Sequence, residues 1–422
     1  MLKAILPVRS LLIAIFLLMA GGGFLNTLVA LRLERAGSGA LAIGLVGTAY
    51  FAGLTLGSVR VPALVGRIGH IRAFAAFVTL LSADTLAYAL HTHAVFWGAL
   101  RFLDGLCLAG IYVCVESWLN ERAEPDRRGM VLAGYMIMLY GGQAAGQFLI
   151  RLGAGGPAVP LLVGSILISL AAIPVLLTRI AAPETGDFAP LPFRELYQTS
   201  PLGMVGAGLT GVMLGAFYAL GAVFARRLGM DLSQTTLFMS VVILGGVVLQ
   251  WPLGWLSDRI DRRKVIVLAF AGTLAAALTI ALTAEAGVLL LGLGALFGGL
   301  SFALYPLCAA HTNDHLAPEK RVAASGGLVL VYSLGAAAGP ATGSLAVSLT
   351  GASGLFLFIA ACASAALSFA LLRQAKSAPV PAHLQENYVG LPRTSPLAAS
   401  LDPLASETSA APDEPGETGS RH

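Results

Sequence analysis

Long apolar runs separated by short polar loops dominate the amino-acid sequence. A helix of about 20 apolar residues spans the hydrocarbon core of a bilayer, and the runs at roughly 236–256 and 265–284 are each of that length. Twelve such runs have their centres near Met19, Thr48, Leu81, Gly110, Tyr140, Ile168, Val212, Leu244, Leu274, Leu300, Leu334 and Ser364. The pattern predicts an all-α polytopic membrane protein with twelve transmembrane helices.

Basic residues are distributed unequally between the two sets of loops. The loops that follow even-numbered helices contain most of them: Arg67, Arg72, Arg122, Arg127, Arg128, Arg179, Arg194, Arg259, Arg262, Arg263, Lys264, Lys320 and Arg321. The opposite loops contain only Arg32, Arg35, Arg151, Arg226 and Arg227. Because Lys and Arg accumulate in cytoplasmic loops, we expect a multi-pass protein of the bacterial inner membrane with both termini in the cytoplasm.

A charged loop between the eighth and ninth runs reads GWLSDRIDRRK over Gly254–Lys264. A weaker copy, PALVGRIGHIR, begins 192 residues earlier at Pro62, with Gly66 in the place of the aspartate. The pair resembles the signature loops of the major facilitator superfamily, and the resemblance extends over about residues 8–374. It implies a gating role for this loop, with four candidate residues: Asp258, Arg259, Arg262 and Arg263.

Equal offsets between landmarks indicate an internal duplication. Arg127 and Gly141 each lie 194 residues before a like residue, Arg321 and Gly335. We therefore expect two six-helix bundles, residues 1–180 and 201–374, joined by a cytoplasmic linker over 181–200. The resemblance implies that the two repeats are related by an axis along the membrane normal. Residues 375–422 are rich in Pro, Ala, Ser and Glu and predict a disordered cytoplasmic tail.

Composition agrees with a membrane protein. The chain is 57% hydrophobic and only 11% charged, against about 25% in soluble domains, and its mean hydropathy is +0.81. The net charge of +4 is carried by loops and predicts no nucleic-acid partner. Four cysteines, Cys107, Cys114, Cys308 and Cys362, lie inside apolar runs. We interpret them as small buried side chains, and their positions indicate neither a disulfide set nor a metal site. We expect no metal and no cofactor.

The fourth helix carries the densest set of polar residues. Arg101, Gly105, Leu108, Tyr112 and Glu116 form one stripe, in which Arg101 and Glu116 are separated by roughly 22 Å. A charge at mid-helix costs about 2.5–3.5 kcal/mol on insertion scales, so each charge is a functional candidate. Arg101 followed by Gly105 resembles the superfamily pattern that is often tied to proton movement.

Arg101, Asp104 and Glu116 are therefore candidates for proton coupling. The alternative is a structural role, in which Arg101 pairs with Asp104 or with Asp84. Intramembrane ion pairs serve both purposes, and the sequence leaves the two open.

Two further segments resemble the YcaD-like branch of the superfamily. They are Glu116–Arg122, reading ESWLNER, and Tyr305–Asp314, reading YPLCAAHTND. Glu116 and His311 would lie at equivalent, cytoplasmic ends of the fourth and tenth helices. The alternative is that both only stabilise helix ends beside Arg122, Arg127 or Arg321, and we favour it for His311. His311 and His315, with Asp314, could suggest a metal site, but no further ligand cluster supports it, and zinc needs three or four ligands.

A glycine-rich stretch in the fifth helix, Gly142–Gln147, resembles one linked to antiporters, but Gln147 stands where that pattern has proline. Close packing is the better interpretation. The first, fourth, seventh and tenth helices line the cavity in the superfamily. The resemblance thus makes Asn26, Tyr112, Tyr218 and Tyr305 candidate substrate contacts, although single polar residues at helix interfaces more often bond a neighbouring helix.

These features together predict a secondary active transporter that moves a small solute by alternating access, with proton coupling as an open option. A receptor or scaffold with a transporter fold is the alternative. A membrane-embedded enzyme is disfavoured because HExxH and GxSxG are absent, and a primary pump because GxxxxGK[ST] is absent. The expected partners are a small solute, protons and the lipid bilayer, and the protein is expected to be a monomer.

Overall fold

A computed structural model of the protein describes residues 6–124, 127–178, 190–283, 285–376, 378–381, 385 and 387–395. The regular elements in these ranges are helices. Those of the first half are η1 Leu6–Val8, α2 Arg9–Gly22, α3 Leu25–Arg35, α4 Ala40–Ile68, α5 His70–Ala87, α6 Ala94–Arg122, α7 Arg128–Gln147, η3 Phe148–Gly155 and α8 Val159–Leu176. Those of the second half are α9 Phe193–Thr199, α10 Pro201–Arg227, α11 Leu232–Ser257, α12 Arg262–Thr283, α13 Val288–Asn313, α14 Pro318–Thr350 and α15 Gly354–Lys376.

The helices account for the twelve predicted membrane crossings. Ten described segments are long and apolar enough to cross a membrane, and the first of them, Leu6–Arg35, joins η1, α2 and α3. α5 and α7 occupy the third and fifth predicted positions and complete the set. The all-α polytopic fold predicted from the apolar runs is therefore confirmed.

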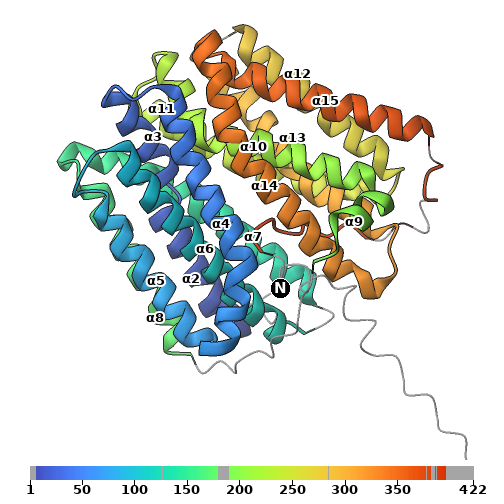
Figure 1. Ribbon diagram of the computed structural model, residues 1–422, viewed down its shortest axis with the longest axis horizontal. Helices are drawn as coiled ribbons and strands as arrows, with labels where there is room; N and C mark the ends of the chain where they lie inside the picture. Colours follow the sequence, from blue (N-terminus) through green and yellow to red (C-terminus); the bar gives the residue numbers. More distant parts are fainter. Residues whose placement is uncertain are drawn as a thin grey trace, which may run out of the picture.

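The helices form two bundles. α2 and α4 to α8 pack mainly on one another and make the first bundle together with α3, which packs mainly on α10 across the interface; α10 to α15 make the second bundle. In Figure 1, α5 and α8 lie at one edge of the molecule, and α12 and α15 lie at the other. The short helix α9 belongs to the predicted linker and is held to α14, where the Leu191 amide donates to the Ala323 carbonyl at 2.8 Å. Linker residues 181–189 lie outside the described residues.

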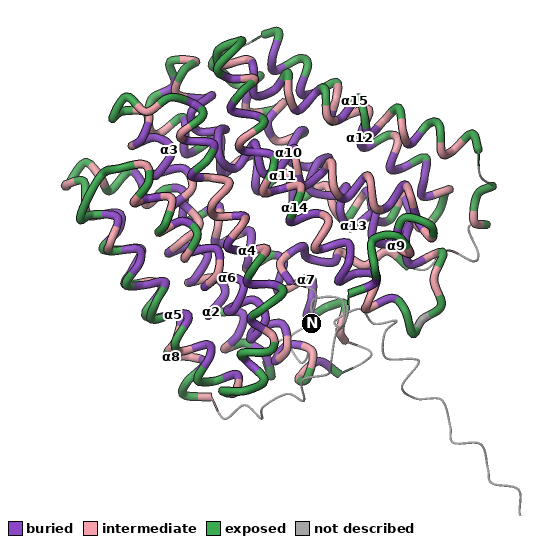
Figure 2. Tube along the Cα trace, viewed as in Figure 1, coloured by how far each residue is buried: buried purple, intermediate pink, exposed green. Residues whose placement is uncertain are grey.

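Large apolar side chains face outward on the peripheral helices. Ile166 on α8, Val248 on α11 and Leu372 on α15 are 56%, 67% and 60% exposed. Figure 2 shows the exposed residues along the outer sides of the bundles and the buried ones between helices. Apolar exposure repeated over the outside of a protein is what contact with lipid tails requires.

The first membrane crossing is interrupted between α2 and α3. A helix break in a bilayer leaves backbone groups that must find partners inside the protein. The Gly23 amide still donates to the Met19 carbonyl at 2.8 Å, and the Gln147 Nε2 atom donates to the Gly23 carbonyl at 2.9 Å. The Thr27 hydroxyl donates to Gln147 Oε1 at 2.8 Å. Gln147 therefore stabilises the break, which a proline side chain at that position could not do.

The two bundles touch directly at one end of the molecule, here called the closed end. An added Cβ at Gly44 on α4 would meet the Pro340 carbonyl and the Ser344 side chain on α14. The Thr48 hydroxyl donates to the Ala337 carbonyl at 2.9 Å. Small residues allow such close backbone approach between helices in a membrane.

Two more contacts belong to the closed end. The Ser240 hydroxyl on α11 donates to the Ala144 carbonyl on α7 at 2.9 Å, and Arg227 on α10 forms an ion pair with Glu34 on α3 at 2.7 Å. Each of them links one bundle to the other. The closed end is therefore sealed by helix contacts.

At the opposite end, here called the tail end, part of the C-terminal tail lies between the bundles. Residues 387–395 form an extended segment, which appears in red beside α7 and α14 in Figure 1. Leu391 in this segment is buried. The structure differs here from the expectation of a disordered tail. Carboxylates inside the protein accept hydrogen bonds from this segment, and such long-range partners cannot be inferred from the composition of the tail. Residues 396–422 lie outside the described residues.

The tight packing at the closed end generates a prediction. Gly44→Leu places a large side chain against the Pro340 carbonyl, so we expect the bundles to separate there. Ala219 lies against Gly47 at this end, so a cysteine placed at Ala219 reports on the opening. A membrane-impermeant thiol reagent should label this cysteine severalfold faster in the Gly44→Leu variant than in the protein that retains Gly44.

Gly292→Leu is the matched control, because no atom lies within 4 Å of a Cβ added at Gly292. Labelling at the same rate in the Gly44→Leu variant and the parent would contradict the role assigned to this contact.

Candidate functional site

A central cavity lies between the two bundles. The first bundle contributes side chains from α3, α4, α6 and α7, and the second contributes α10 and α14. The lining residues are Asn26, Tyr50, Phe51, Leu54, Tyr112, Leu139, Tyr140, Gln143, Tyr218, Tyr332, Arg393 and Thr394. Tyrosine and amide groups on apolar walls are typical of sites that hold a small molecule.

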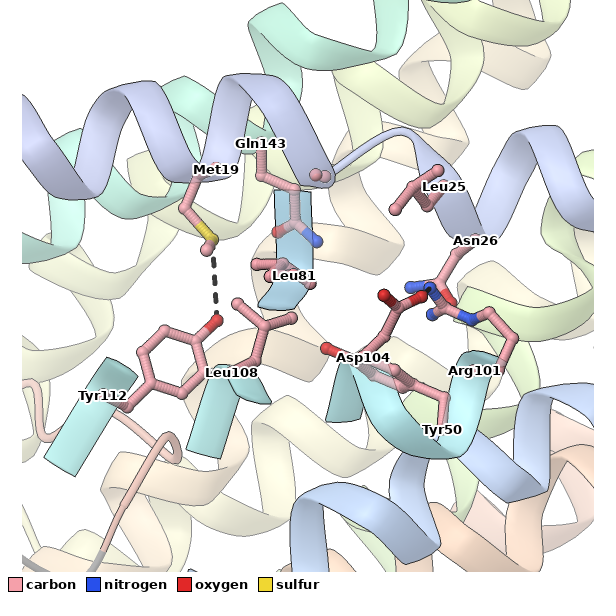
Figure 3. A pocket seen from close by; sticks show the side chains of 12 residues that line it. Met19, Leu25, Asn26, Tyr50, Leu81, Arg101, Asp104, Leu108, Tyr112 and Gln143 are labelled. Atoms are coloured by element: carbon pink, nitrogen blue, oxygen red, sulfur yellow. Dashed lines mark hydrogen bonds and ion pairs between the residues drawn. The ribbon is translucent and has the colours of Figure 1, made fainter. Parts of the chain in front are cut away.

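A side chamber lies beside this cavity, inside the first bundle. It shares Asn26, Tyr50, Tyr112 and Gln143 with the cavity. Figure 3 shows Arg101 and Asp104 at one side of the chamber beside Asn26, and Tyr112 at the other, with its hydroxyl 3.5 Å from Met19 Sδ. The chamber thus places the charged part of α6 beside the cavity.

Arg101 is fully engaged inside the first bundle. Its Nη1 atom forms an ion pair with Asp104 Oδ2 at 2.9 Å, and its Nη2 atom donates to Asn26 Oδ1. The guanidinium carbon lies 4.2 Å from the centre of the Tyr50 ring. The Tyr88 hydroxyl donates to Asp104 Oδ2 at 2.6 Å. The sequence offered an ion pair of Arg101 with either Asp104 or Asp84, and the structure contains the pair with Asp104.

Asp84 on α5 adds a second carboxyl group to the same cluster. It is 4% exposed and interacts electrostatically with both Asp104 and Arg101. Asp84 Oδ2 and Asp104 Oδ1 are buried and have no hydrogen-bond partner among the described residues. Two carboxyl groups thus lie near one guanidinium, and Asp104 is the one that forms the ion pair with it among the described residues.

Glu116 lies at the other end of the predicted stripe and is completely buried. It accepts a hydrogen bond from the Tyr135 hydroxyl at 2.8 Å, and further bonds from the hydroxyls of Thr394 and Ser395. Within the described parts of the chain it forms no ion pair. The sequence left open a second interpretation, in which Glu116 stabilises its helix end beside Arg122, Arg127 or Arg321. The structure differs, because the partners of Glu116 are neutral hydroxyl groups from α7 and from the tail.

The four candidate substrate contacts occupy different positions. Asn26, Tyr112 and Tyr218 line the central cavity, and the Tyr218 hydroxyl lies 3.5 Å from Gln143 Oε1. Tyr305 stands behind the lining, with its ring centre 5.3 Å from that of Tyr332.

Sequence reasoning missed four lining residues of the helices that carry a phenol hydroxyl or an amide: Tyr50, Tyr140, Gln143 and Tyr332. Each is a polar group inside an apolar run, which was the available signal. They lie on α4, α7 and α14, outside the four helices that the resemblance singles out.

The charged loop after α11 is tied to the end of α13. Arg262 Nη1 donates to both carboxyl oxygens of Asp314, at 2.6 and 2.7 Å, and Nη2 donates to Asp258 Oδ1 at 3.3 Å. Asp258 Oδ1 also accepts the Tyr388 backbone amide at 2.7 Å. A Cβ at Gly254 would meet the Tyr388 ring, so this glycine makes room for the tail.

The other two loop arginines serve local contacts. Arg259 stacks on Trp255 at 3.7 Å, and Arg263 forms an ion pair with Asp261 at 2.9 Å. Burial works against the charged form of Asp261. The side-chain and backbone hydrogen bonds from Arg263 and the charges of Arg263 and Lys264 outweigh it and lower the pKa of this carboxyl.

His311 is buried near the end of α13. His315 Nδ1 lies 2.8 Å from the His311 carbonyl oxygen, and the two rings are 4.7 Å apart. Asp314 is committed to Arg262. In the described ranges, no three His, Cys, Asp or Glu side chains converge as metal ligands would.

Known proteins resemble this chain in sequence and in fold. A sequence model of the Major Facilitator Superfamily matches residues 11–282 and 202–406. An MFS-type transporter named YcaD from Salmonella arizonae is 30% identical over 388 residues, which is 90% of this chain and 98% of the relative. The YcaD of Salmonella newport matches to the same extent.

Two solved structures share the fold. The nucleoside transporter NupG superposes with a TM-score of 0.70 at 16% identity, covering 88% of this chain and all of NupG. A bacterial homologue of the human lysosomal transporter Spinster, in an inward-facing and occupied conformation, gives 0.68 at 16% identity, covering 88% and 96%.

The shared use of Asp258 by the loop and the tail generates a prediction. Asp258→Asn removes the negative charge that holds Arg262 and the Tyr388 amide. A hydrogen bond to a charged group contributes about 1.5–3 kcal/mol, which shifts a balanced equilibrium by about tenfold or more. Cysteine labelling from the two sides of the membrane should show the changed balance between access states.

Asp261→Asn is the control, because the Asp261 carboxylate accepts its hydrogen bonds from Arg263 in the same loop. An unchanged labelling pattern in the Asp258→Asn variant would remove Asp258 from the gate.

Proposed function

This chain belongs to the Major Facilitator Superfamily, and from that membership we propose that it is a secondary active transporter of a small solute that works by alternating access. As a member of this family it is a multi-pass membrane transporter and not an enzyme. We place it in the bacterial inner membrane with both termini in the cytoplasm, as the basic loops favour. The tail end of the molecule then faces the cytoplasm.

The observation that carries the proposal is the central cavity between the bundles. It is sealed at the closed end by contacts such as Thr48 to Ala337, and the chain's own tail enters it from the other end. A pathway of this kind supports rocking of one bundle against the other around a fixed central site. A solute would enter from the tail end after the tail had withdrawn and leave after the closed end had opened.

Proton coupling is the finer part of the proposal. A buried carboxylate without a cationic partner costs free energy, and proton uptake avoids that cost. Glu116 fits this requirement because its partners are three hydroxyl groups. Two of those hydroxyls belong to the tail, so withdrawal of the tail would leave Glu116 with Tyr135. Proton uptake by Glu116 could therefore accompany the transport cycle.

Arg101 has a different role in this mechanism. A guanidinium stays protonated and cannot itself carry the proton. It holds Asp104 through the 2.9 Å ion pair and orients Asn26, which lines the cavity. A planar guanidinium makes these two contacts at once, and a lysine side chain cannot reproduce that geometry.

The experiment compares proteoliposomes with and without the protein in a mixture of small metabolites. Solutes that accumulate only with the wild-type protein are then measured under a pH gradient and in exchange. We expect Glu116→Gln to abolish pH-driven accumulation and to keep exchange, because the cavity is preserved and the titrating group is lost. We expect Arg101→Lys to impair both.

Glu121→Gln on the same helix is the matched control, since Glu121 is exposed. Wild-type pH-driven accumulation in Glu116→Gln would remove Glu116 from the proton path and make Asp104 the next candidate. If the wild-type protein moved no solute under either condition, the transport proposal itself would fail.

A further inference from the structure

Arg393 of the tail lies between the two bundles, where it lines the central cavity. Its guanidinium carbon lies 4.5 Å from the ring centre of Phe302, 5.4 Å from Tyr332 and 5.7 Å from Tyr140. Phe302 is on α13, Tyr332 on α14 and Tyr140 on α7, so both bundles contribute to the enclosure. These three rings are here called the aromatic cage.

The cage holds the charge of Arg393 without an ion pair. No carboxylate lies within ion-pair distance of Arg393 in the described part of the chain, and the side chain is buried. Aromatic faces attract cations through the ring quadrupole, and the attraction grows when the cation is desolvated. The same faces provide no comparable attraction for an anion. The cage therefore has the chemistry of a cation site.

The lining of the cavity is compatible with a cation as well. Arg393 is the one charged residue among the lining residues of the described chain, and the others are aromatic, aliphatic, hydroxyl or amide side chains. In the neighbouring side chamber, the charge of Arg101 is balanced by its ion pair with Asp104. A cavity without the tail would therefore hold no unbalanced positive charge to repel another cation.

We propose that the aromatic cage is a binding site for an organic cation, and that Arg393 occupies this site in competition with it. The ligand class is a guanidinium, amidinium or amine on a compact apolar body, since the cage surrounds such a group with rings. An organic cation would then be the class of solute carried, which rests on the proposed transport function. Binding at the cage can nevertheless be measured without transport.

The tail and the solute cannot share the cage. Thr394 and Ser395 are anchored on Glu116, and this holds Arg393 against the rings. Because the tail is tethered to α15, its effective concentration at the cage is high. The apparent affinity for a cation falls in proportion to the fraction of molecules with an empty cage. If the tail is docked in nine molecules of ten, its removal tightens cation binding about tenfold.

The test measures equilibrium binding of radiolabelled benzamidine to the purified full-length protein in detergent. Benzamidine is an aromatic cation, benzamide is its neutral counterpart of the same shape, and benzoate is the anion. We expect Arg393→Ala to bind benzamidine about tenfold more tightly than the wild type, with no gain for benzamide or benzoate. Lys376→Ala removes an exposed positive charge before the tail segment and should behave as the wild type.

Two further variants keep the result interpretable. A chain that ends after Lys376 lacks the whole tail and should show the same gain in benzamidine affinity as Arg393→Ala. If Arg393→Ala folds poorly, binding to the truncated chain tests the proposal in its place. Phe302→Leu in the Arg393→Ala background keeps an apolar side chain but loses the ring, and we expect benzamidine binding to weaken about fivefold.

The proposal is overturned if neither Arg393→Ala nor the truncated chain binds benzamidine more tightly than the wild type, or if benzamide gains equally. If that happens while wild-type vesicles still accumulate a solute, the cation site is wrong and the transport function stands. If benzamidine binds as expected and vesicles move no solute, the cation site stands and the transport function fails.

Discussion

A bilayer contains no water that could satisfy a buried polar group, and this constraint determines where the polar side chains of this protein lie. Each unsatisfied group costs several kcal/mol in hydrocarbon. The broken first helix illustrates the consequence, because Gln147 bonds the Gly23 carbonyl and Thr27 across the break. The charge of Arg101 is likewise satisfied inside the protein, by an ion pair with Asp104, a hydrogen bond to Asn26 and the face of the Tyr50 ring.

The two ends of the molecule are closed by different means. At the closed end, Gly44 and Gly47 allow α4 to pack directly against the second bundle. At the tail end, the segment 387–395 fills the space between the bundles and supplies the groups that bond Glu116 and Asp258. A seal made of helices requires movement of a whole bundle to open, whereas a seal made of a tethered segment requires only its withdrawal.

The tail also links sites that the sequence presents as unrelated. Tyr388 contacts the loop at Asp258, Arg393 enters the aromatic cage, and Ser395 reaches Glu116. Asp258 is in the second half of the chain and Glu116 is in the first. A single extended segment therefore connects the charged loop, the cavity and the buried carboxyl, and its position depends on all three.

The sequence by itself determined the twelve helices and the family, because the length of an apolar run and the spacing of a loop motif are local properties of the chain. It also identified Arg101, Asp104 and Glu116 as charges that needed an explanation, since hydrocarbon penalises every one of them. Which partner each charge has was decided by the tertiary structure: Asp84 and Asn26 come from other helices, and Thr394 comes from a tail whose composition indicates disorder. These partnerships depend on which helix faces pack together over long sequence separations, so no local pattern contains them.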